Sequence, residues 1–459
     1  MSASGRRLLA GWGGRPASSA EVVCPATTGE AAAVVARAAD EQGPVLARGL
    51  GRSYGDAASS AGGTVLDLTG LDQVLGFDES SGLLRAEAGI SVEGLLRFSV
   101  PRGFFVPVTP GTRQVTLGGA IAADVHGKNH HLDGSLGAWV RSIRLATPAG
   151  ERLLAPAGEG AGFWATVGGM GLTGVVLDAT LELVPIETSY MLVDTERGAD
   201  LDECMSLMSE RDEEYRYSVA WIDCLKGGSG LGRGVLTRAN HAGLADLRAA
   251  APRRAGAPLS FSPRQVARVP VTPPFRLPSA LAVTAFNEVW FRKAPRRRTG
   301  ELQSLGAYFH PLDGVGSWNR LYGPAGFTQY QFVVPFGAEA VVREVVEALG
   351  ARGVPSLLAV LKRFGAADPA PLSFPAPGWT LALDLPLSVP GLGELLDGFD
   401  ELVASHGGRV YFAKDGRLRP ELVSEMYPRL EDWRRACDDL DPARVFQSDL
   451  SRRLHLRKA

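Results

Sequence analysis

Arg48-Gly-Leu-Gly-Arg-Ser-Tyr-Gly-Asp56 follows the apolar run 45–47 and is the stretch from which the fold is predicted. Its three glycines can adopt positive φ without steric cost, so backbone N–H groups can converge on an anion such as a pyrophosphate. The spacing differs from the GxGxxG of a nicotinamide-binding helix, and no convincing acidic residue follows about 20 positions later. The stretch therefore indicates an anion cradle of another kind, with a glycine-rich surface turn as the alternative.

Two further glycine-rich stretches follow. Pro110–His131 contains PGTRQVTLGGAIAADVHGKNHH, and Phe163–Gly174 contains FWATVGGMGLTG. Small residues allow a bulky planar group to lie against the backbone, and the polar residues after the second bend can hydrogen-bond it. For the third stretch, a core turn anchored by a tryptophan is the alternative.

Charge and cysteine pattern exclude several classes of protein. The 459 residues carry 48 Lys and Arg against 50 Asp and Glu, without the basic excess of a nucleic-acid-binding protein. The four cysteines lack CxxC spacing, and His130 and His131 have no ligand partner at metal-binding spacing, so we expect neither a disulfide framework nor a metal. No signal peptide or 18-residue apolar run is found in the sequence, so we expect a location in the cytoplasm or peripherally at the inner membrane, with the cell envelope as the alternative.

Hydrophobic periodicity predicts an α+β fold. Helices are expected at 30–41 and 92–98, and strands at 45–47, 64–68, 84–89, 140–146 and 174–184. After Pro185, long polar stretches separate strands expected at 217–223, 328–334 and 380–385, which places a domain boundary near that proline. The segment 253–278 lacks periodicity and is expected to be a mobile loop.

In this order and spacing, the three glycine-rich stretches resemble the FAD domain of the vanillyl-alcohol oxidase / p-cresol methylhydroxylase flavoprotein superfamily. Within it, the stretches 110–131, 310–313, 322–331, 371–379 and 413–415 are similar to an actinobacterial family of flavin oxidases that act on the ribose 2′-hydroxyl of decaprenylphosphoryl-β-D-ribose. The similarity runs from about residue 11 to about residue 456. It implies a two-subdomain FAD-binding fold of the vanillyl-alcohol oxidase type at 1–187, an inserted substrate domain on an antiparallel sheet flanked by helices at 188–405, and a return to the FAD domain at 406–459.

The resemblance also implies site residues. The flavin is expected to contact Ala47, Arg48, Gly49, Leu50, Gly51, Arg52, Ser53, Tyr54, Gly55, Asp56, Ala57, Gly111, Thr116, Leu117, Gly118, Gly119, Ala123, Asp124, Val125, His126, Val176 and Tyr411. The substrate is expected to contact Lys128, Gln329, Gln331, Ala382 and Lys414. Ala382 stands where mycobacterial members carry cysteine, so thiol-directed inhibitors lose their anchor here. Arg52 stands where relatives with a covalent flavin often carry histidine, which implies non-covalent FAD.

Oxidation of a secondary alcohol by a flavin needs a group that takes or polarises the hydroxyl proton and a donor that stabilises the reduced flavin. Lys414 is the expected cation, with an exposed lysine before a turn as the alternative. Gln329 and Gln331 lie two apart on a predicted strand and therefore share a face, as residues of a merely polar strand face also do. Tyr54, His126 and Gln331 complete the expected catalytic set, with structural roles as their alternatives.

A polyprenyl phosphate substrate requires basic contacts. The arginines of 253–278 and 296–298 can contact a phosphate or an anionic membrane surface, with a solvated charge run as the alternative. The resemblance implies that a separate NADH-dependent reductase takes up the keto sugar on the way to an arabinose donor for the cell wall. A flavin oxidase of a soluble polyol, sugar or aldonolactone is the second candidate function, and a flavin-binding regulator without turnover is the third.

Overall fold

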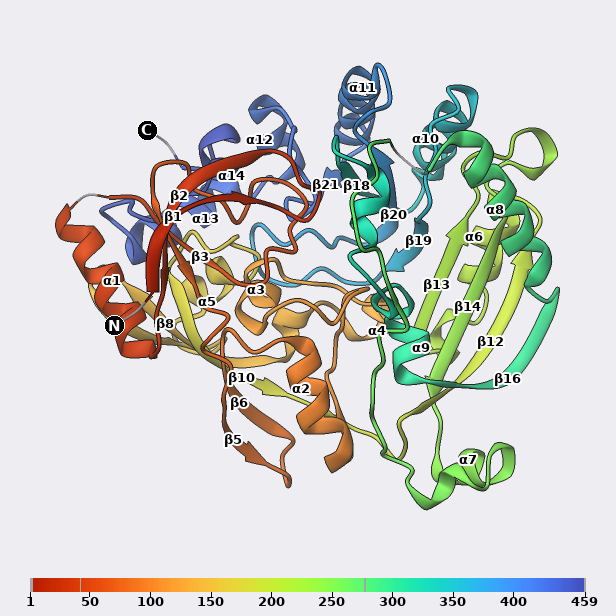
Figure 1. Ribbon diagram of the computed structural model, residues 1–459, viewed down its shortest axis with the longest axis horizontal. Coiled ribbons are helices and arrows are strands. Elements are labelled where there is room, and N and C mark those ends of the chain that lie inside the picture. Colours follow the sequence, from red (N-terminus) through yellow and green to blue (C-terminus); the bar gives the residue numbers. More distant parts are fainter. Residues whose placement is uncertain (1–2, 42, 276–277, 458–459) are drawn as a thin grey trace.

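The structure is a computed structural model that describes residues 3–41, 43–275 and 278–457, and three β-sheets dominate this part of the chain (Figure 1). Within these residues, the first sheet contains, in spatial order, β1 (Ala3–Ala10), β2 (Ala17–Cys24), β4 (Thr64–Asp67) and β3 (Val45–Arg48). The second contains β5 (Val74–Asp78), β6 (Leu83–Glu87), β10 (Val175–Glu182), β8 (Val140–Thr147) and β9 (Gly150–Leu154). The third contains β16 (Arg297–Ser304), β12 (Tyr190–Gly198), β14 (Gly234–His241), β13 (Tyr217–Ile222), β19 (Ala359–Phe364), β20 (Gly378–Pro386), β18 (Phe327–Val334) and β21 (Arg409–Val410).

Short strand pairs and helices complete the described structure. The pairs are β7 (Phe104–Phe105) with β11 (Val184–Pro185) and β15 (Ala267–Arg268) with β17 (Val315–Gly316). The helices are α1 (Thr28–Glu41), α2 (Val92–Ser99), α3 (Leu117–Ala122), α4 (His130–Asp133), α5 (Gly160–Thr166), α6 (Leu201–Ser209), α7 (Leu244–Ala250), α8 (Ala280–Lys293), α9 (Leu305–Phe309), α10 (Glu339–Ala351), α11 (Leu392–Ser405), α12 (Val423–Met426), α13 (Leu430–Leu440) and α14 (Asp449–Arg453).

The predicted elements are confirmed where hydrophobic periodicity was strong. In α1, Ala31, Val34, Val35 and Ala38 are buried at helical spacing. In α2, the hydroxyl of Ser91 accepts the Gly94 backbone N–H and so fixes the start of the helix. The sheets are mixed or antiparallel and lie beside helices, so the α+β prediction is also confirmed.

The two faces of the third sheet have opposite character because side chains alternate along each strand. On β18, Tyr330 and Phe332 are buried in the core that also contains α10 and α11. The intervening Gln329 and Gln331 lie on the other face. One face of this sheet therefore stabilises the fold, and the other carries buried polar groups.

The end of the chain returns to its beginning. β21 pairs with β18 in the third sheet, and residues 445–453 then contact the first sheet. There, Val45 N–H donates to the Val445 carbonyl over 2.8 Å, and the Ser18 hydroxyl donates to the Asp449 carboxylate over 2.6 Å. The loop 411–416 between these contacts is thereby held against the loop that follows β3.

The segment 253–278 contains a short 3-10 turn at Arg254–Gly256 and the two-residue strand β15 in its described part. Its mobility stays a prediction. In the parts of the chain that the structure describes, every helix is too short or too polar to cross a membrane.

Candidate active site

Two walls face each other across a deep cavity. One wall consists of the glycine-rich loops of the N-terminal half, and the other is the polar face of β18, β19 and β20. The predicted site residues that line this cavity are Ala47, Arg48, Gly49, Leu50, Gly51, Arg52, Ser53, Tyr54, Ala57, Gly111, Thr116, Gly118, Gly119, Ala123, Val125, His126, Val176, Gln329, Gln331, Ala382, Tyr411 and Lys414. Residues far apart in the sequence thus converge on one space, as the resemblance implied.

The loop after β3 presents unused backbone donors. Among the described residues, no acceptor is found for the backbone N–H groups of residues 50–53. Gly51 has φ +62°, and a Cβ on Gly49 would lie 2.1 Å from Thr116 Oγ1. Both positions therefore require glycine. A row of free N–H groups in such a turn is suited to binding an anion.

The two arginines of this loop have different roles. Arg48 donates from Nη1 to the Ala58 carbonyl and from Nη2 to the Ala10 carbonyl, each over 2.7 Å, so it holds the loop in place. The guanidinium of Arg52 stacks 3.9 Å from the ring centre of Trp12. Its buried Nε has no partner within the described structure. Arg52 rather than Arg48 thus offers a free donor to the cavity.

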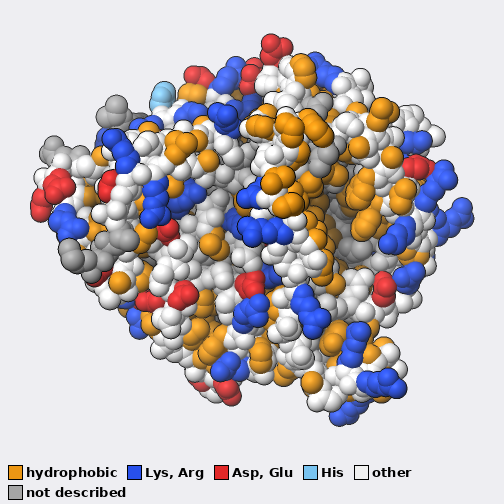
Figure 2. Space-filling view, in the orientation of Figure 1, with side chains coloured by type: hydrophobic (Ala, Val, Ile, Leu, Met, Phe, Trp, Pro, Cys, Tyr) orange, Lys and Arg blue, Asp and Glu red, His pale blue; other side chains and the backbone are white. Residues whose placement is uncertain are grey.

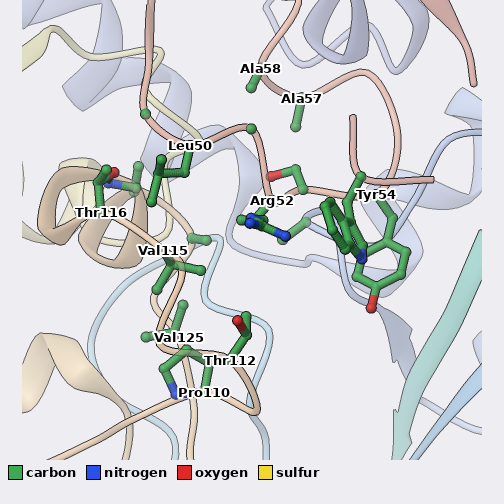
Figure 3. Close-up of a pocket in the computed structure, with 18 of the residues that line it drawn as sticks. Leu50, Arg52, Tyr54, Ala57, Ala58, Pro110, Thr112, Val115, Thr116 and Val125 are labelled. Carbon is green, nitrogen blue, oxygen red and sulfur yellow. Dashed lines mark hydrogen bonds between the residues drawn. The ribbon is translucent and has the colours of Figure 1, made fainter. Parts of the chain in front are cut away.

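The loop 110–116 lies close to the loop 48–56 that follows β3. Figure 3 shows the side chain of Leu50 pointing toward Val115 and Thr116, with Arg52 projecting into the space between the loops. The Thr112 hydroxyl donates to the carboxylate of Asp313 over 2.7 Å, and this carboxylate also accepts the backbone N–H of residue 113. A residue that follows α9 therefore fixes the position of this loop.

The pairing register of β18, β19 and β20 determines which side chains lie on the sheet wall. Gln331 pairs with Ala382, which in turn pairs with Val360 on β19. Two pairs further along, and therefore on the same face, Thr380 pairs with Lys362. Cross-strand partners lie on the same face of a sheet. This pairing places amide, hydroxyl and amine side chains on one buried surface next to His126.

His126 is hydrogen-bonded on both ring nitrogens. Its Nε2 lies 3.0 Å from Gln331 Nε2, and its Nδ1 lies 3.0 Å from Lys362 Nζ. Burial lowers the pKa of His126 well below its usual value. The imidazole is therefore neutral, and one nitrogen must donate while the other accepts.

The Gln331 amide decides which nitrogen donates. Its Nε2 also donates to Thr380 Oγ1 over 3.2 Å, because the Thr380 hydroxyl itself donates to the Phe332 carbonyl over 2.8 Å. Gln331 Nε2 is thus an NH2 group and gives its second hydrogen to His126 Nε2. His126 then carries its proton on Nδ1 and donates it to Lys362, which must be an uncharged amine.

The pKa of Lys362 agrees with this assignment. Burial, with Lys414 and Lys128 nearby, lowers it from 10.5 to about 7. A buried amine with a pKa near neutrality is suited to accepting and returning a proton.

Lys414 has a different environment. Burial lowers its pKa to about 8, and the carboxylate of Asp384 opposes that shift. Its ammonium lies 4.3 Å from the ring centre of Tyr54, whose hydroxyl accepts the Gln329 amide over 3.2 Å. Gln329 also donates to Asp384 over 2.5 Å. Aromatic ring and carboxylate both favour the charged form of Lys414.

Five predicted residues do not line the cavity. Gly55 packs against the backbone of Asp415, and Asp56 pairs with Arg453 over 2.8 Å. The side chain of Leu117 is buried in the hydrophobic core. The glycine-rich loop was expected at Gly55 and Asp56, but these residues and Leu117 support the cavity wall from behind.

Asp124 and Lys128 also turn away from the cavity. Asp124 accepts the Ser135 hydroxyl over 2.7 Å and the Gly137 N–H over 2.9 Å, so it secures the backbone beneath His126. Lys128 Nζ donates to the Tyr308 carbonyl over 2.6 Å and lies 4.0 Å from the Tyr308 ring centre. Although Lys128 lies only two residues after His126, its side chain points toward Tyr308 and not into the cavity.

Several cavity residues were missed from the sequence. They are Trp12, Ala58, Leu68, Ala88, Pro110, Thr112, Val115, Ala122, Met170, Gly171, Gly174, Leu312, Asp313, Trp318, Leu358, Val360, Lys362 and Ala413. The third glycine-rich stretch did indicate Met170, Gly171 and Gly174. A lysine directly after the apolar run 357–361 was a signal for Lys362.

The residues present fit a flavin dinucleotide. Free N–H groups at residues 50–53 and the unpartnered Nε of Arg52 suit a pyrophosphate, and the small residues of the second loop leave room for a planar ring system beside the sheet wall. No cluster of His, Cys, Asp or Glu suited to a metal ion is found in the described residues.

Comparison with known proteins agrees with this fit. A family model described as an FAD binding domain matches residues 19–156. Over 454 residues the chain is 43% identical to decaprenylphosphoryl-beta-D-ribose oxidase of Mycolicibacterium smegmatis, covering 98% of both chains. It is 25% identical over 440 residues to L-gulono-1,4-lactone dehydrogenase of Mycobacterium tuberculosis, covering 94% of this chain and 95% of the other. It is 31% identical over 176 residues to alditol oxidase of a Streptomyces species, covering 38% and 41% of the two chains. The chain is therefore an oxidoreductase with FAD as its cofactor and belongs to the decaprenylphosphoryl-beta-D-ribose oxidase family.

Proposed function

We propose that this protein oxidises the ribose 2′-hydroxyl of decaprenylphosphoryl-β-D-ribose, or of a related polyprenylphosphoryl ribose, to the 2′-keto sugar. The observation that carries the proposal is a pair of lysines that line the cavity opposite the N–H-rich loop after β3: Lys362 on β19 and Lys414 on the loop after β21. Burial lowers the pKa of Lys362 to about 7 and that of Lys414 to about 8, so Lys362 gives up its proton more readily than Lys414 does. Bound FAD supplies the acceptor for the hydride that leaves the carbinol carbon.

Lys362 removes the hydroxyl proton in this proposal. Lys362 Nζ lies 3.0 Å from His126 Nδ1, and in the tautomer assigned through Gln331 its lone pair accepts the Nδ1–H. The substrate hydroxyl replaces His126 as the donor to Lys362 Nζ and then transfers its proton to that nitrogen. Gln331 and Thr380 position His126, so they act on Lys362 through the imidazole.

Lys414 stabilises negative charge in this proposal. Its ammonium lies in the cavity close to Tyr54, and Asp384 favours its charged form. An ammonium held in a buried site interacts strongly with charge that develops on a nearby oxygen. Gln329 orients the phenol of Tyr54 and the carboxylate of Asp384 around that cation.

FAD is held without a covalent bond in this proposal, because Arg52 occupies the expected attachment position. Residues 1–187 and 406–459 form the FAD-binding domain, and residues 188–405 form the substrate domain. Contacts of 445–453 with the first sheet support this division. The keto sugar is then reduced by a separate NADH-dependent reductase, since a 2′-ketone must accept hydride to give the epimer.

The absorbance spectrum of the purified protein tests the proposal. We expect a flavin spectrum that bleaches on anaerobic addition of a prenylphosphoryl ribose and not on addition of an alditol or aldonolactone. Bleaching by the soluble sugars alone would assign the protein to a different substrate. Denaturation should release all of the yellow colour from the polypeptide, and retained colour would refute non-covalent binding.

A further inference from the structure

One region of the surface combines exposed apolar side chains with positive charge. Seven of the fourteen large hydrophobic side chains that are exposed in the described residues fall between positions 266 and 290, a twentieth of the chain. They are Val266, Val271, Phe275, Leu281, Phe286, Val289 and Trp290, and we call them the apolar patch. Such a concentration marks an interaction site rather than scattered surface residues.

Helix α8 carries four of these residues. Val283 and Asn287 are its buried residues, and the Asn287 amide donates to Asp223 over 2.7 Å. Phe286 and Trp290 lie beside them at helical spacing and are half exposed, whereas Leu281 and Val289 are turned further toward the outside. Phe286 and Trp290 stack on each other with ring centres 6.0 Å apart, and Leu281 is 86% exposed. Figure 1 shows α8 at the periphery of the molecule beside β13 and β14. Its apolar outer face has no cover in the described structure.

The same stretch is strongly basic. Residues 253–298 contain nine arginines and one lysine but a single acidic residue, Glu288, in a chain whose net charge is −2. Glu288 is already paired with Arg233 and Arg292. Figure 2 shows hydrophobic side chains gathered on this face, with Lys and Arg side chains at its margin. Interfacial helices combine exposed Trp, Phe and Leu with Lys and Arg in this way.

One end of the patch, at Val266, adjoins a segment that lines the cavity. Val266 N–H donates to the Gly314 carbonyl over 2.8 Å, and Val269 N–H donates to the Gly316 carbonyl over 2.9 Å. Residues 312, 313 and 318, on either side of these carbonyls, line the cavity. A surface that contacts a bilayer through the patch would therefore bring the cavity close to the lipid.

We propose that the apolar patch and the arginines at 296–298 dock this protein on an anionic lipid bilayer. Its apolar side chains enter the acyl boundary while the arginines contact lipid phosphates. The inference deepens the proposed function and rests on it for its purpose, since a prenyl chain can then stay in the bilayer while its sugar enters the cavity. Arg297 and Arg298 lie 3.9 and 3.1 Å from the carboxylates of Glu196 and Glu301, but residues 253–298 keep a large excess of positive charge. Charge complementarity therefore selects a lipid surface, because this excess repels a basic partner and attracts phosphates.

Sedimentation of the FAD-loaded full chain with vesicles tests this proposal. The probes are vesicles of phosphatidylcholine alone and vesicles with about one-third phosphatidylglycerol. We expect binding to the anionic vesicles only. The triple variant Leu281→Ser/Phe286→Ser/Trp290→Ser should lose about tenfold or more of that binding, because it removes the inserted side chains. The triple variant Arg296→Gln/Arg297→Gln/Arg298→Gln should lose a similar factor.

The matched control is Leu8→Ser/Leu75→Ser/Leu153→Ser, which changes three exposed leucines outside the patch. It should bind vesicles like the unchanged protein. Equal loss in the control and patch variants, or no binding by the unchanged protein, would overturn the proposal. Flavin bleaching by a short-chain, water-soluble prenylphosphoryl ribose separates the two proposals. Its absence in the unchanged protein contradicts the proposed function and leaves the vesicle result standing.

Discussion

The two walls of the cavity are built by opposite means. The loop wall uses backbone: glycines, free N–H groups at residues 50–53, and small side chains. The sheet wall uses side chains: Lys362, Gln329, Gln331 and Asp384 are joined by hydrogen bonds to each other or to His126 and Tyr54, and Lys414 reaches the same space from the loop 411–416. Backbone donors can hold a large cofactor without titrating, whereas proton transfer needs groups with pKa values near neutrality. The comparison indicates that binding and chemistry are assigned to different walls.

The largest effect is expected from breaking the sheet wall at Lys362. Lys362→Ala should lower the rate of flavin reduction about 100- to 10,000-fold, as expected when a general base is removed, while FAD stays bound. Stopped-flow absorbance under anaerobic conditions measures this rate. Added methylamine should restore part of it, because a small amine can occupy the vacated space.

Val360→Ala is the matched control, since Val360 lines the same wall two residues earlier on β19. It should change the rate far less and show no response to methylamine. A rate for Lys362→Ala close to that of the control would remove Lys362 from the chemistry.

A second, smaller effect is expected where the two walls meet. A Cβ on Gly55 would lie 1.9 Å from the Asp415 carbonyl oxygen, and Asp415 adjoins Lys414. Backbone contacts this close must separate, so Gly55→Ala should cost about 1–3 kcal/mol in the free energy of unfolding and weaken FAD binding roughly tenfold. Thermal unfolding and FAD titration measure the two effects. In Gly76→Ala the new methyl group meets no atom within 4 Å, so this variant should match the unchanged protein.

The loop wall was the more predictable of the two. It could be predicted from neighbouring residues alone, because a glycine-rich turn after an apolar run implies free backbone donors regardless of how the rest of the chain folds. The sheet wall depends on register. Gln329 and Gln331 were predicted to share a face because they lie on one strand, but Lys362 meets His126 only through pairing of β19 with β20. Lys128 shows the converse: its motif neighbours line the cavity while its own side chain packs on Tyr308.

The pH dependence sharpens the difference between the two lysines. Lys362 accepts a proton only when uncharged, and its pKa is about 7, so the rate of flavin reduction should rise with pH through that value. Lys414 acts as a cation with a pKa of about 8, so the rate should fall as the pH rises beyond it. The expected profile is bell-shaped, changing up to tenfold per pH unit on each limb. A profile that is flat between pH 6 and 9 would contradict both roles.

The smallest effect on turnover is expected from Ala382→Cys, which introduces a thiol whose labelling measures the accessibility of the sheet wall. Ala382 lines the cavity on β20, so Ala382→Cys should place a thiol where a maleimide can reach it, with turnover changed less than about threefold because the added volume is one sulfur atom. Mass spectrometry identifies the labelled residue. The native thiols of Cys204 and Cys437 are buried, and burial raises the pKa of each to about 12, so they should react slowly.

Ala359→Cys is the matched control for this labelling, because Ala359 points into the core from the other face of the sheet. Equal labelling of the two variants would show that the alternation of faces assigned to this sheet is wrong. If substrate protects the introduced thiol in the Ala382→Cys variant alone, the sugar lies against this wall, because a ligand shields only the side chains that it covers.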